Sequence, residues 1–224
     1  GVIATSIQCG AYHACVVLSD DSLTCWGSNA YGQLGLGDTN DRGDAAGEMG
    51  DSLAKVNLGS GRSVKSVACG RRHTCAILDD STVKCWGDNT FGQLGLGTGA
   101  GSTTPAVSAV NLGSGRTAKR VVTGQFHTCV VLDDDDLKCF GANRFGQLGV
   151  SDTAPRGITS GQMGDALVAV NLGGGRKVRS VASCDATAEG GDCGNSLPVG
   201  AETRFNQLAE VLSSYDRIYP FFLP

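Results

Sequence analysis

Short apolar stretches alternate with polar turns along most of the chain, at the spacing of β-strands. Residues 75–78 are apolar, residues 79–81 form a polar turn, and residues 83–86 alternate apolar and polar positions. This order predicts a β-hairpin. Two more strand-like stretches accompany each hairpin: 54–58 and 64–68 in one case, 109–112 and 118–122 in the next. The pattern predicts an all-β fold built from units of four short strands, which is the composition of a propeller blade.

One sequence motif occurs three times, at a period of about 50 to 60 residues. Each copy contains x-Gly-x-x-His, a cysteine two positions later, and a second cysteine ten positions after the first. The second cysteine begins the run Cys-(Trp/Phe)-Gly-x-Asn-x-(Tyr/Phe)-Gly-Gln-Leu-Gly. Each copy is therefore one supersecondary unit that needs its neighbours to bury its apolar surface. Residues shared by all copies are expected to belong to the scaffold, and function is expected where the copies differ.

The order and spacing of these positions resemble the repeat of the regulator of chromosome condensation family. The resemblance covers residues 3–183 and implies a β-propeller, a fold that in this family typically has seven blades. Full repeats are expected at about 3–67, 64–121 and 118–177, and a fourth begins at 178–183. We therefore expect three to four blades in a partial or open ring. Its apolar blade sides need cover from partner chains, further repeats or the chain's own C-terminal segment.

Residues 184–224 depart from the repeat. Apolar residues recur there at helical spacing and predict one short amphipathic helix at about 202–216. An apolar tail follows at 218–224, and it either packs on the last blade or docks to a larger complex. Four of its side chains are candidate partner-binding residues: Tyr219, Phe221, Phe222 and Leu223.

Cysteine spacing predicts disulfides within the hairpins. If the paired cysteines lie directly cross-strand, the same register places Val17 opposite Leu23 and gives apolar pairs in the other two copies as well. A fourth pair is plausible after the repeats, and the remaining Cys9 and Cys69 fit small buried side chains better than a fifth bridge. The four predicted pairs are Cys15 with Cys25, Cys75 with Cys85, Cys129 with Cys139, and Cys184 with Cys193. Such pairs favour an oxidising compartment, extracellular or luminal, over the alternative of six reduced core cysteines in the cytosol.

Composition and charge narrow the function classes. The 34 glycines and 41% hydrophobic content indicate a globular chain rich in turns. A net charge of -4 without a Lys/Arg cluster argues against a nucleic-acid surface. No apolar run reaches the roughly 18 residues of a transmembrane segment. The N-terminus shows no signal-peptide pattern, so any targeting peptide is expected to have been removed or to lie outside this sequence.

Groups that resemble reactive sites have simpler structural interpretations. His13, His73 and His127 each precede a cysteine by two, but they occupy one repeat position in three successive blades, whereas a zinc site needs its ligands around one ion. We expect them to form hydrogen bonds within their own blades. The aspartates at 20–21, 79–80 and 133–136 fit hairpin turns better than calcium or catalytic carboxylates. No phosphate loop, dinucleotide fingerprint or nucleophile elbow occurs, so no cofactor or metal is expected.

The repeats differ most in the loops after Gly-Gln-Leu-Gly, where a rigid scaffold usually carries recognition. These loops supply further candidate partner-binding residues: Arg42, Glu48, Met49 and Met163. We interpret the chain as a non-catalytic protein-binding or structural subunit that docks to other protein subunits of a larger assembly. The family resemblance implies an alternative, guanine nucleotide exchange on a small GTPase. An enzyme whose site lies on the variable loops is a third hypothesis.

Overall fold

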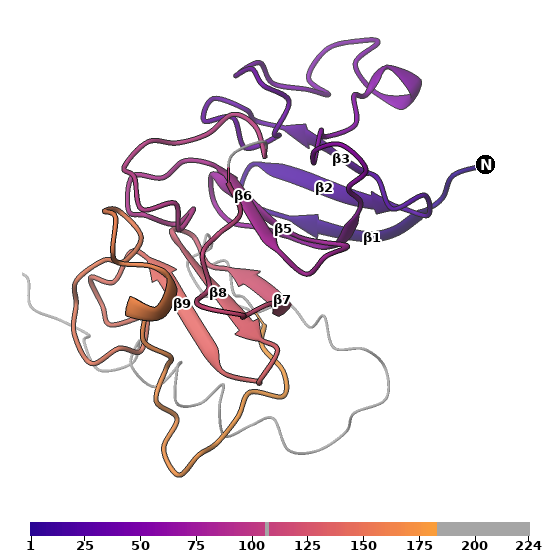
Figure 1. Ribbon diagram of the computed structural model, residues 1–224. Coiled ribbons are helices and arrows are strands. Elements are labelled where there is room, and N and C mark those ends of the chain that lie inside the picture. Colours follow the sequence, from indigo (N-terminus) through magenta and orange to yellow (C-terminus); the bar gives the residue numbers. More distant parts are fainter. Residues whose placement is uncertain (106–107, 183–224) are drawn as a thin grey trace, which may run out of the picture. The chain divides into compact units, whose positions relative to one another are not determined.

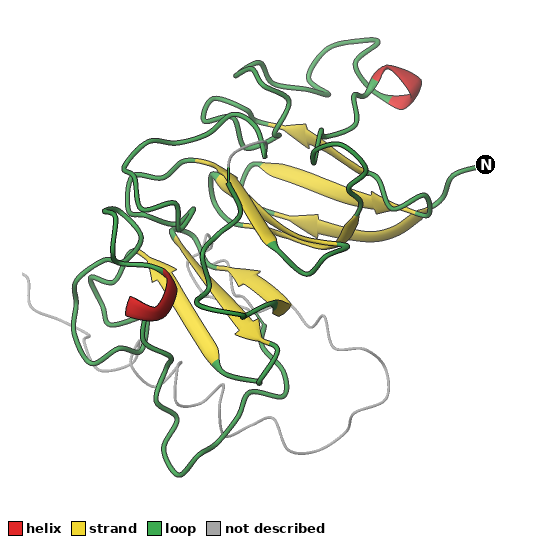
Figure 2. Cartoon of the chain, in the orientation of Figure 1, coloured by secondary structure: helices red, strands yellow, loops and turns green. Residues whose placement is uncertain are grey.

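The computed structural model describes residues 1–105 and 108–182, which belong to one compact unit, Gly1–Cys193. They form three antiparallel sheets of three strands each, so the chain has the all-β architecture that the sequence predicts (Figures 1 and 2). We call the sheets blades 1, 2 and 3. Their strands are β1 (Ala4–Cys9), β2 (His13–Leu18) and β3 (Leu23–Gly27), then β4 (Val64–Cys69), β5 (His73–Leu78) and β6 (Val83–Gly87), then β7 (Ala118–Thr123), β8 (His127–Leu132) and β9 (Leu137–Gly141).

The hairpins have the predicted register. Cys15 pairs with Cys25 and Val17 with Leu23 between β2 and β3, and the equivalent residues pair in blades 2 and 3. Asp21 has a φ of 57° in the connecting turn, in the left-handed region that Asp and Asn tolerate better than most residues. Alternation along each strand therefore sends the cysteines and their apolar neighbours to fixed faces of the sheet.

The fourth strand of each blade was predicted wrongly. Residues 54–58 form only a single β-bridge, between Thr24 and Lys55, together with a hydrogen bond from Val56 N to Leu23 O. The Asn57 side chain then accepts a hydrogen bond from Gly59 N and turns the chain away. Such a side-chain turn competes with continued strand pairing. The other blades place Asn111 and Asn171 in the same way before Gly113 and Gly173.

The core lies between the blades. Cys15, Val17 and Leu34 of blade 1 pack with Leu78 and Trp86 of blade 2 in one buried cluster. A second cluster joins blades 2 and 3 in the same manner, and Figure 1 shows the sheet of β4–β6 between the other two. Each blade thus covers one face of its neighbour, as expected for repeats that cannot bury their own apolar surface.

Helical structure in residues 1–105 and 108–182 is limited to two short 3-10 turns, Gly50–Ser52 and Gly164–Ala166. The fourth repeat begins as the others do, since Val178 N donates to Asp135 O just as Val64 N donates to Asp21 O. The predicted helix at 202–216 and the apolar tail at 218–224 lie outside the described residues. None of the helical segments in the described ranges could span a lipid bilayer.

Candidate functional site

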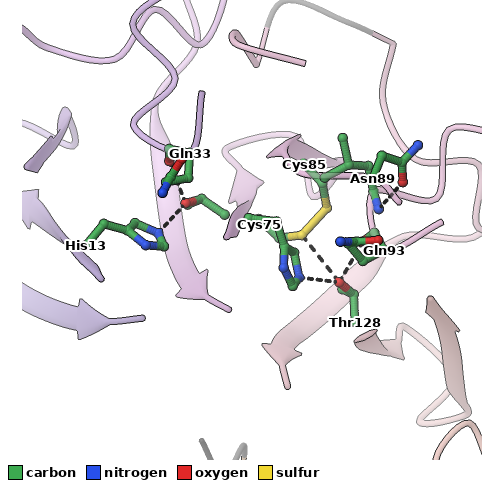
Figure 3. Close-up of a disulfide and its surroundings, with 10 residues drawn as sticks. His13, Gln33, Cys75, Cys85, Asn89, Gln93 and Thr128 are labelled. Atoms are coloured by element: carbon green, nitrogen blue, oxygen red, sulfur yellow. Dashed lines mark hydrogen bonds between the residues drawn. A yellow bond between two sulfur atoms is a disulfide. The ribbon is translucent and has the colours of Figure 1, made fainter. Parts of the chain in front are cut away.

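A chain of hydrogen bonds connects blade 1 to blade 2. The Thr74 hydroxyl donates to the main-chain carbonyl of Gln33 over 2.8 Å, and Thr74 Oγ1 lies 2.8 Å from His13 Nε2 (Figure 3). Because the threonine proton is committed to the carbonyl, Nε2 of His13 must carry the proton and donate to Thr74. The histidine and the carbonyl belong to blade 1 and the hydroxyl to blade 2. We call this arrangement the histidine–threonine latch.

Blades 2 and 3 repeat the latch. His73 Nε2 lies 3.1 Å from Thr128 Oγ1, and the Thr128 hydroxyl donates to Gln93 O over 2.8 Å. Figure 3 shows this hydroxyl beside the Cys75–Cys85 disulfide, with Cys75 Sγ at 3.7 Å. The expectation that each histidine bonds within its own blade was therefore wrong for His13 and His73. The partner is in the next blade because neighbouring sheets place these side chains face to face.

Burial keeps the latch histidines neutral. Desolvation lowers the pKa of His13 to about 4. Desolvation is the main cause that lowers the pKa of His73 to about 3, and electrostatic coupling to His13 and His127 lowers it further. Protonation would add a proton at Nδ1, which has no hydrogen-bond partner in either ring. These histidines are structural donors, unsuited to exchange protons near neutral pH.

One group of potential metal ligands occurs in the described part of the chain. His13, Cys15 and Cys69 have ligand atoms within 4.8 Å of one another. Cys15 is already joined to Cys25 in a disulfide, so it offers no thiolate. Burial is the main cause that raises the pKa of the Cys69 thiol, and the nearby Cys9 adds to it. The donor set therefore does not fit a zinc site while the disulfide is intact.

Three hairpin disulfides are present at the predicted positions: Cys15–Cys25, Cys75–Cys85 and Cys129–Cys139. The first two lie in the buried clusters between blades. Cys9 and Cys69 are both free thiols, and only Cys69 is buried as expected, since Cys9 is exposed. The fourth predicted pair, Cys184 with Cys193, lies outside the described residues.

The hairpin aspartates stabilise turns, as the sequence suggested. Asp20 Oδ1 accepts hydrogen bonds from the main chain and hydroxyl of Ser22, and Lys55 forms an ion pair with its other oxygen. The Lys55 contact is the first of several that lower the pKa of Asp20 to about 2. Arg62 forms ion pairs with Asp79 and Asp80 in blade 2. These carboxylates are charged and already partnered.

Two candidate partner-binding residues contact their own loop. Arg42 forms an ion pair with Asp38, and the Glu48 carboxylate accepts hydrogen bonds from Gly43 N and Ala45 N. The corresponding loop of blade 3 repeats both roles with Arg156, which pairs with Asp152, and Gln162. Both side chains therefore help to hold the loop in shape.

The two loop methionines differ in exposure. Met49 is 44% exposed and remains available on the surface. Met163 is only 9% exposed and belongs to the core between blades 2 and 3, so its assignment to a binding surface was wrong. An ideal Cβ at Gly95 would lie 2.9 Å from Met163 Cε, which shows how closely the loop and side chain pack. Candidate tail residues Tyr219, Phe221, Phe222 and Leu223 lie outside the described residues.

Sequence reasoning missed a surface formed by arginine and aromatic side chains. The Arg71 guanidinium lies over the ring of Tyr12 at 5.9 Å and over that of Phe126 at 5.4 Å. Phe91 meets Phe126 edge to face, with ring centroids 5.4 Å apart. The signal was available in the variable positions of Gly-x-x-His and in the Tyr/Phe position of the longer motif. Its full set is Tyr12, Tyr31, Arg71, Arg72, Phe91 and Phe126, which we call the arginine–aromatic surface.

These features define a class: a disulfide-stapled segment of repeated β-blades, latched side to side. The described chain matches the regulator of chromosome condensation (RCC1) repeat at residues 4–33, 64–93 and 118–147, and a second model of the repeat matches 20–77 and 81–131. The chain belongs to the RCC1 repeat family.

Known proteins with similar sequences are much longer than the matched region. The chain is 34% identical to the ultraviolet-B receptor UVR8 of Arabidopsis thaliana, over 68% of this chain and 32% of the receptor. It is 32% identical to human HERC4, a probable E3 ubiquitin-protein ligase, over 66% of this chain and 13% of the ligase. The chain therefore spans about a third or less of the length of these curated relatives.

The fold is similar to that of Prp20p from Saccharomyces cerevisiae. The structures align with a TM-score of 0.59 and 20% identity, over 82% of this chain and 40% of Prp20p. At this identity the likeness supports the propeller fold alone.

Proposed function

We propose that the chain is a non-catalytic protein-binding or structural subunit that docks into a larger assembly in an oxidising compartment. The observation that carries the proposal is that the repeated polar side chains have structural partners, while exposed side chains include aromatic residues and a methionine. The latch histidines and threonines bond between blades, and the repeated Asn and Gln side chains bond within their own loops. The exposed side chains include Tyr12, Tyr31, Met49 and Phe91. Tyr, Trp, Met and Arg are the residue types enriched at protein interfaces.

We propose that the chain is not an enzyme because its latch histidines are buried and have lowered pKa values. A general base needs a pKa near the working pH and access to substrate. His13 and His73 are buried and have strongly lowered pKa values, and both are committed to the latch. A surface hollow of about 320 Å³ beside Gly95 and Met163 is lined by glycines, apolar side chains, two serines and an asparagine, without an acid or a base.

The compartment is proposed from the cysteines. Each of the three hairpins carries a bonded pair, and two of the pairs lie in the core between blades. Disulfides of this kind are typical of extracellular or luminal proteins and rare in the cytosol. In the chain-entropy model, closing each short loop contributes about 3 kcal/mol.

Guanine nucleotide exchange remains the second candidate by family analogy. Prp20p has been studied for its binding to Gsp1p and histones, but the likeness to this chain supports only the fold. No residue described here favours exchange over docking.

The test is to purify the native protein without reductant, to crosslink it, and to identify attached peptides by mass spectrometry. The proposal predicts a stoichiometric partner protein whose crosslinks weaken in Met49→Asp, because that side chain is exposed on a variable loop. Val168→Asp is the matched control, since Val168 is also exposed, at 56%. Isolation as a monomer that accelerates nucleotide release from a small GTPase would reject docking in favour of exchange.

A further inference from the structure

The arginine–aromatic surface extends over all three blades. Tyr12 and Tyr31 come from blade 1, Arg71 and Arg72 from blade 2, and Phe126 from blade 3. Arg72 stacks over the Tyr31 ring at 4.5 Å and donates a hydrogen bond to its hydroxyl over 2.8 Å. Because Arg71 touches rings from the blades on either side, the arginine–aromatic surface is one continuous strip.

The strip follows the repeat. In each pair of neighbours, the residue before the histidine of one blade covers the aromatic ring of the preceding blade: Arg72 covers Tyr31, and Phe126 covers Phe91. Even so, Tyr31 is 41% exposed and Phe91 is 39% exposed. Phe145 holds the same position in blade 3 and is 84% exposed. These rings therefore present apolar area to solvent in regular order.

The two arginines of the strip have no ion-pair partners in the described chain. Arg71 and Arg72 form no ion pair with any residue in 1–105 or 108–182, whereas Arg62 and Arg116 at the hairpin turns are each paired with two aspartates. Arg71 Nε is buried without a hydrogen-bond partner. The guanidiniums of Arg71 and Arg72 therefore have no anionic partner among the described residues.

The carboxylates near the strip already have partners. Asp41 and Asp38 accept hydrogen bonds from Asn29, Asp152 accepts one from Asn143, and Asp38 and Asp152 also form ion pairs with Arg42 and Arg156. In the loops that carry the strip, 10–12, 28–33, 70–72, 88–93, 124–126 and 142–147, the sequence contains one acid, Asp88, and three arginines. The Asp88 carboxylate is buried and already accepts hydrogen bonds from the main chain and hydroxyl of Thr90. Among the described residues, Arg71 and Arg72 thus have no ion-pair partner, on a chain whose net charge is -4.

We propose that the arginine–aromatic surface binds an acidic peptide segment of a partner protein. Carboxylates of the segment pair with the guanidinium groups of Arg71 and Arg72, whose forked donors suit carboxylate oxygens. An apolar or aromatic side chain between the carboxylates packs on the rings of Tyr12 and Phe126. The proposal rests on the proposed protein-binding function and names the partner's chemistry.

Single-stranded nucleic acid is the competing polyanion, because stacked aromatics and arginine also suit bases. It is disfavoured because such binding needs a charged groove that tracks many phosphates, whereas this strip holds two arginines, Arg71 and Arg72, on an acidic chain. The peptide needs only a few carboxylates.

The experiment measures binding of the full 224-residue chain to a short fluorescein-labelled peptide of alternating glutamate and tyrosine. The proposal predicts saturable binding that weakens with salt, and at least about tenfold weaker binding by Arg71→Glu/Arg72→Glu. Arg179→Glu is the matched control, because Arg179 is exposed and unpaired in the described chain but lies outside the strip. Tyr12→Ala, at a site 53% exposed, is a second variant that removes a ring without reversing charge.

Three outcomes would overturn the inference: equal binding of the matched lysine–tyrosine peptide, tighter binding of an oligodeoxythymidine, or equal losses in the Arg179→Glu control. Unchanged thermal melting shows that a weakened variant is still folded. If the peptide fails to bind while the native protein retains its crosslinked partner, only the choice of surface is wrong. If the native protein has no partner, the proposed function itself fails.

Discussion

At the scale of single residues, each latch histidine forms the same hydrogen bond, and its threonine partner lies in the next repeat. His13 reaches Thr74 and His73 reaches Thr128, so neither hydrogen bond is local in sequence. Blade 1 carries Ala14 at the threonine position and therefore has no hydroxyl to offer a preceding histidine. The latch is directional, and it depends on the order of the blades.

Replacing His73 with alanine should lower the free energy of unfolding by about 3 kcal/mol, because the change removes a buried donor and leaves a cavity. Chemical denaturation measures the loss, and Thr128→Ser, which keeps the hydroxyl, is the milder control. Elemental analysis should find no metal lost from the variant. Stoichiometric zinc in the parent protein that disappears in the variant would contradict the latch.

Stability should also fall in mild acid. The histidines have a pKa near 6.5 when unfolded and about 4 for His13 when folded, so between these values the unfolded chain binds more protons. Their contribution to the free energy of unfolding is fully present above pH 6.5. It is lost as the pH falls toward 4, and for His13 the loss is about 3 kcal/mol. Asp20, with its pKa lowered to about 2, gains its proton only at lower pH.

Denaturation curves at several pH values test this window, with His13→Gln as the comparison because glutamine does not titrate. The variant should be less stable at neutral pH but should show a shallower fall between pH 6.5 and 4. Equal slopes in the two proteins would mean that the pKa of His13 is the same in the folded and unfolded chain, which would contradict the lowered value.

At the scale of elements, packing between a loop and the next blade fixes the arrangement. Trp86 donates its indole N–H to Gln33 O over 3.0 Å and lies against Gly35. Gly35 has a φ of +74°, and an ideal Cβ there would lie 2.6 Å from Trp86 Nε1. Both the backbone conformation and the contact therefore require glycine.

Substituting Gly35 with alanine should destabilise the protein by about 3 kcal/mol, through left-handed strain and a clash with the indole. Gly61→Ala is the matched control, because its φ is +68° and its Cβ would meet nothing within 4 Å. It should cost only about 1 kcal/mol. Equal losses in both variants by thermal melting would show that packing against Trp86 adds nothing.

Sequence predicted the hairpins, their register and the paired cysteines, because these depend on residues ten positions apart or fewer. The fourth strand failed because a local contact, Asn57 to Gly59, ends the pairing that the apolar pattern favours. The histidine partners and the arginine–aromatic surface depend on contacts between blades. The apolar and polar pattern of one repeat does not indicate which of its side chains will contact a side chain of the next repeat.

At the scale of the whole molecule, the described blades expose the apolar side of blade 1. The residues of β1 are all exposed, with Ile7 at 55%, and Trp26 is only partly buried whereas Trp86 is fully buried. A preceding blade or a partner would cover these groups as blade 1 covers Trp86.

The apolar tail remains a prediction at this scale. Deleting residues 217–224 should weaken assembly or solubility and leave the hairpin disulfides intact, because the tail is expected to cover apolar surface. Sedimentation velocity is the measurement. A truncated chain that stays a compact, soluble monomer with unchanged melting would show that the tail is dispensable.

The most direct test of the account is peptide mapping of the native protein under non-reducing conditions, with free thiols blocked during lysis. The account predicts three linked peptide pairs, Cys15–Cys25, Cys75–Cys85 and Cys129–Cys139, and free thiols at Cys9 and Cys69. Free thiols at all six hairpin cysteines would contradict both the stapled blades and the oxidising compartment.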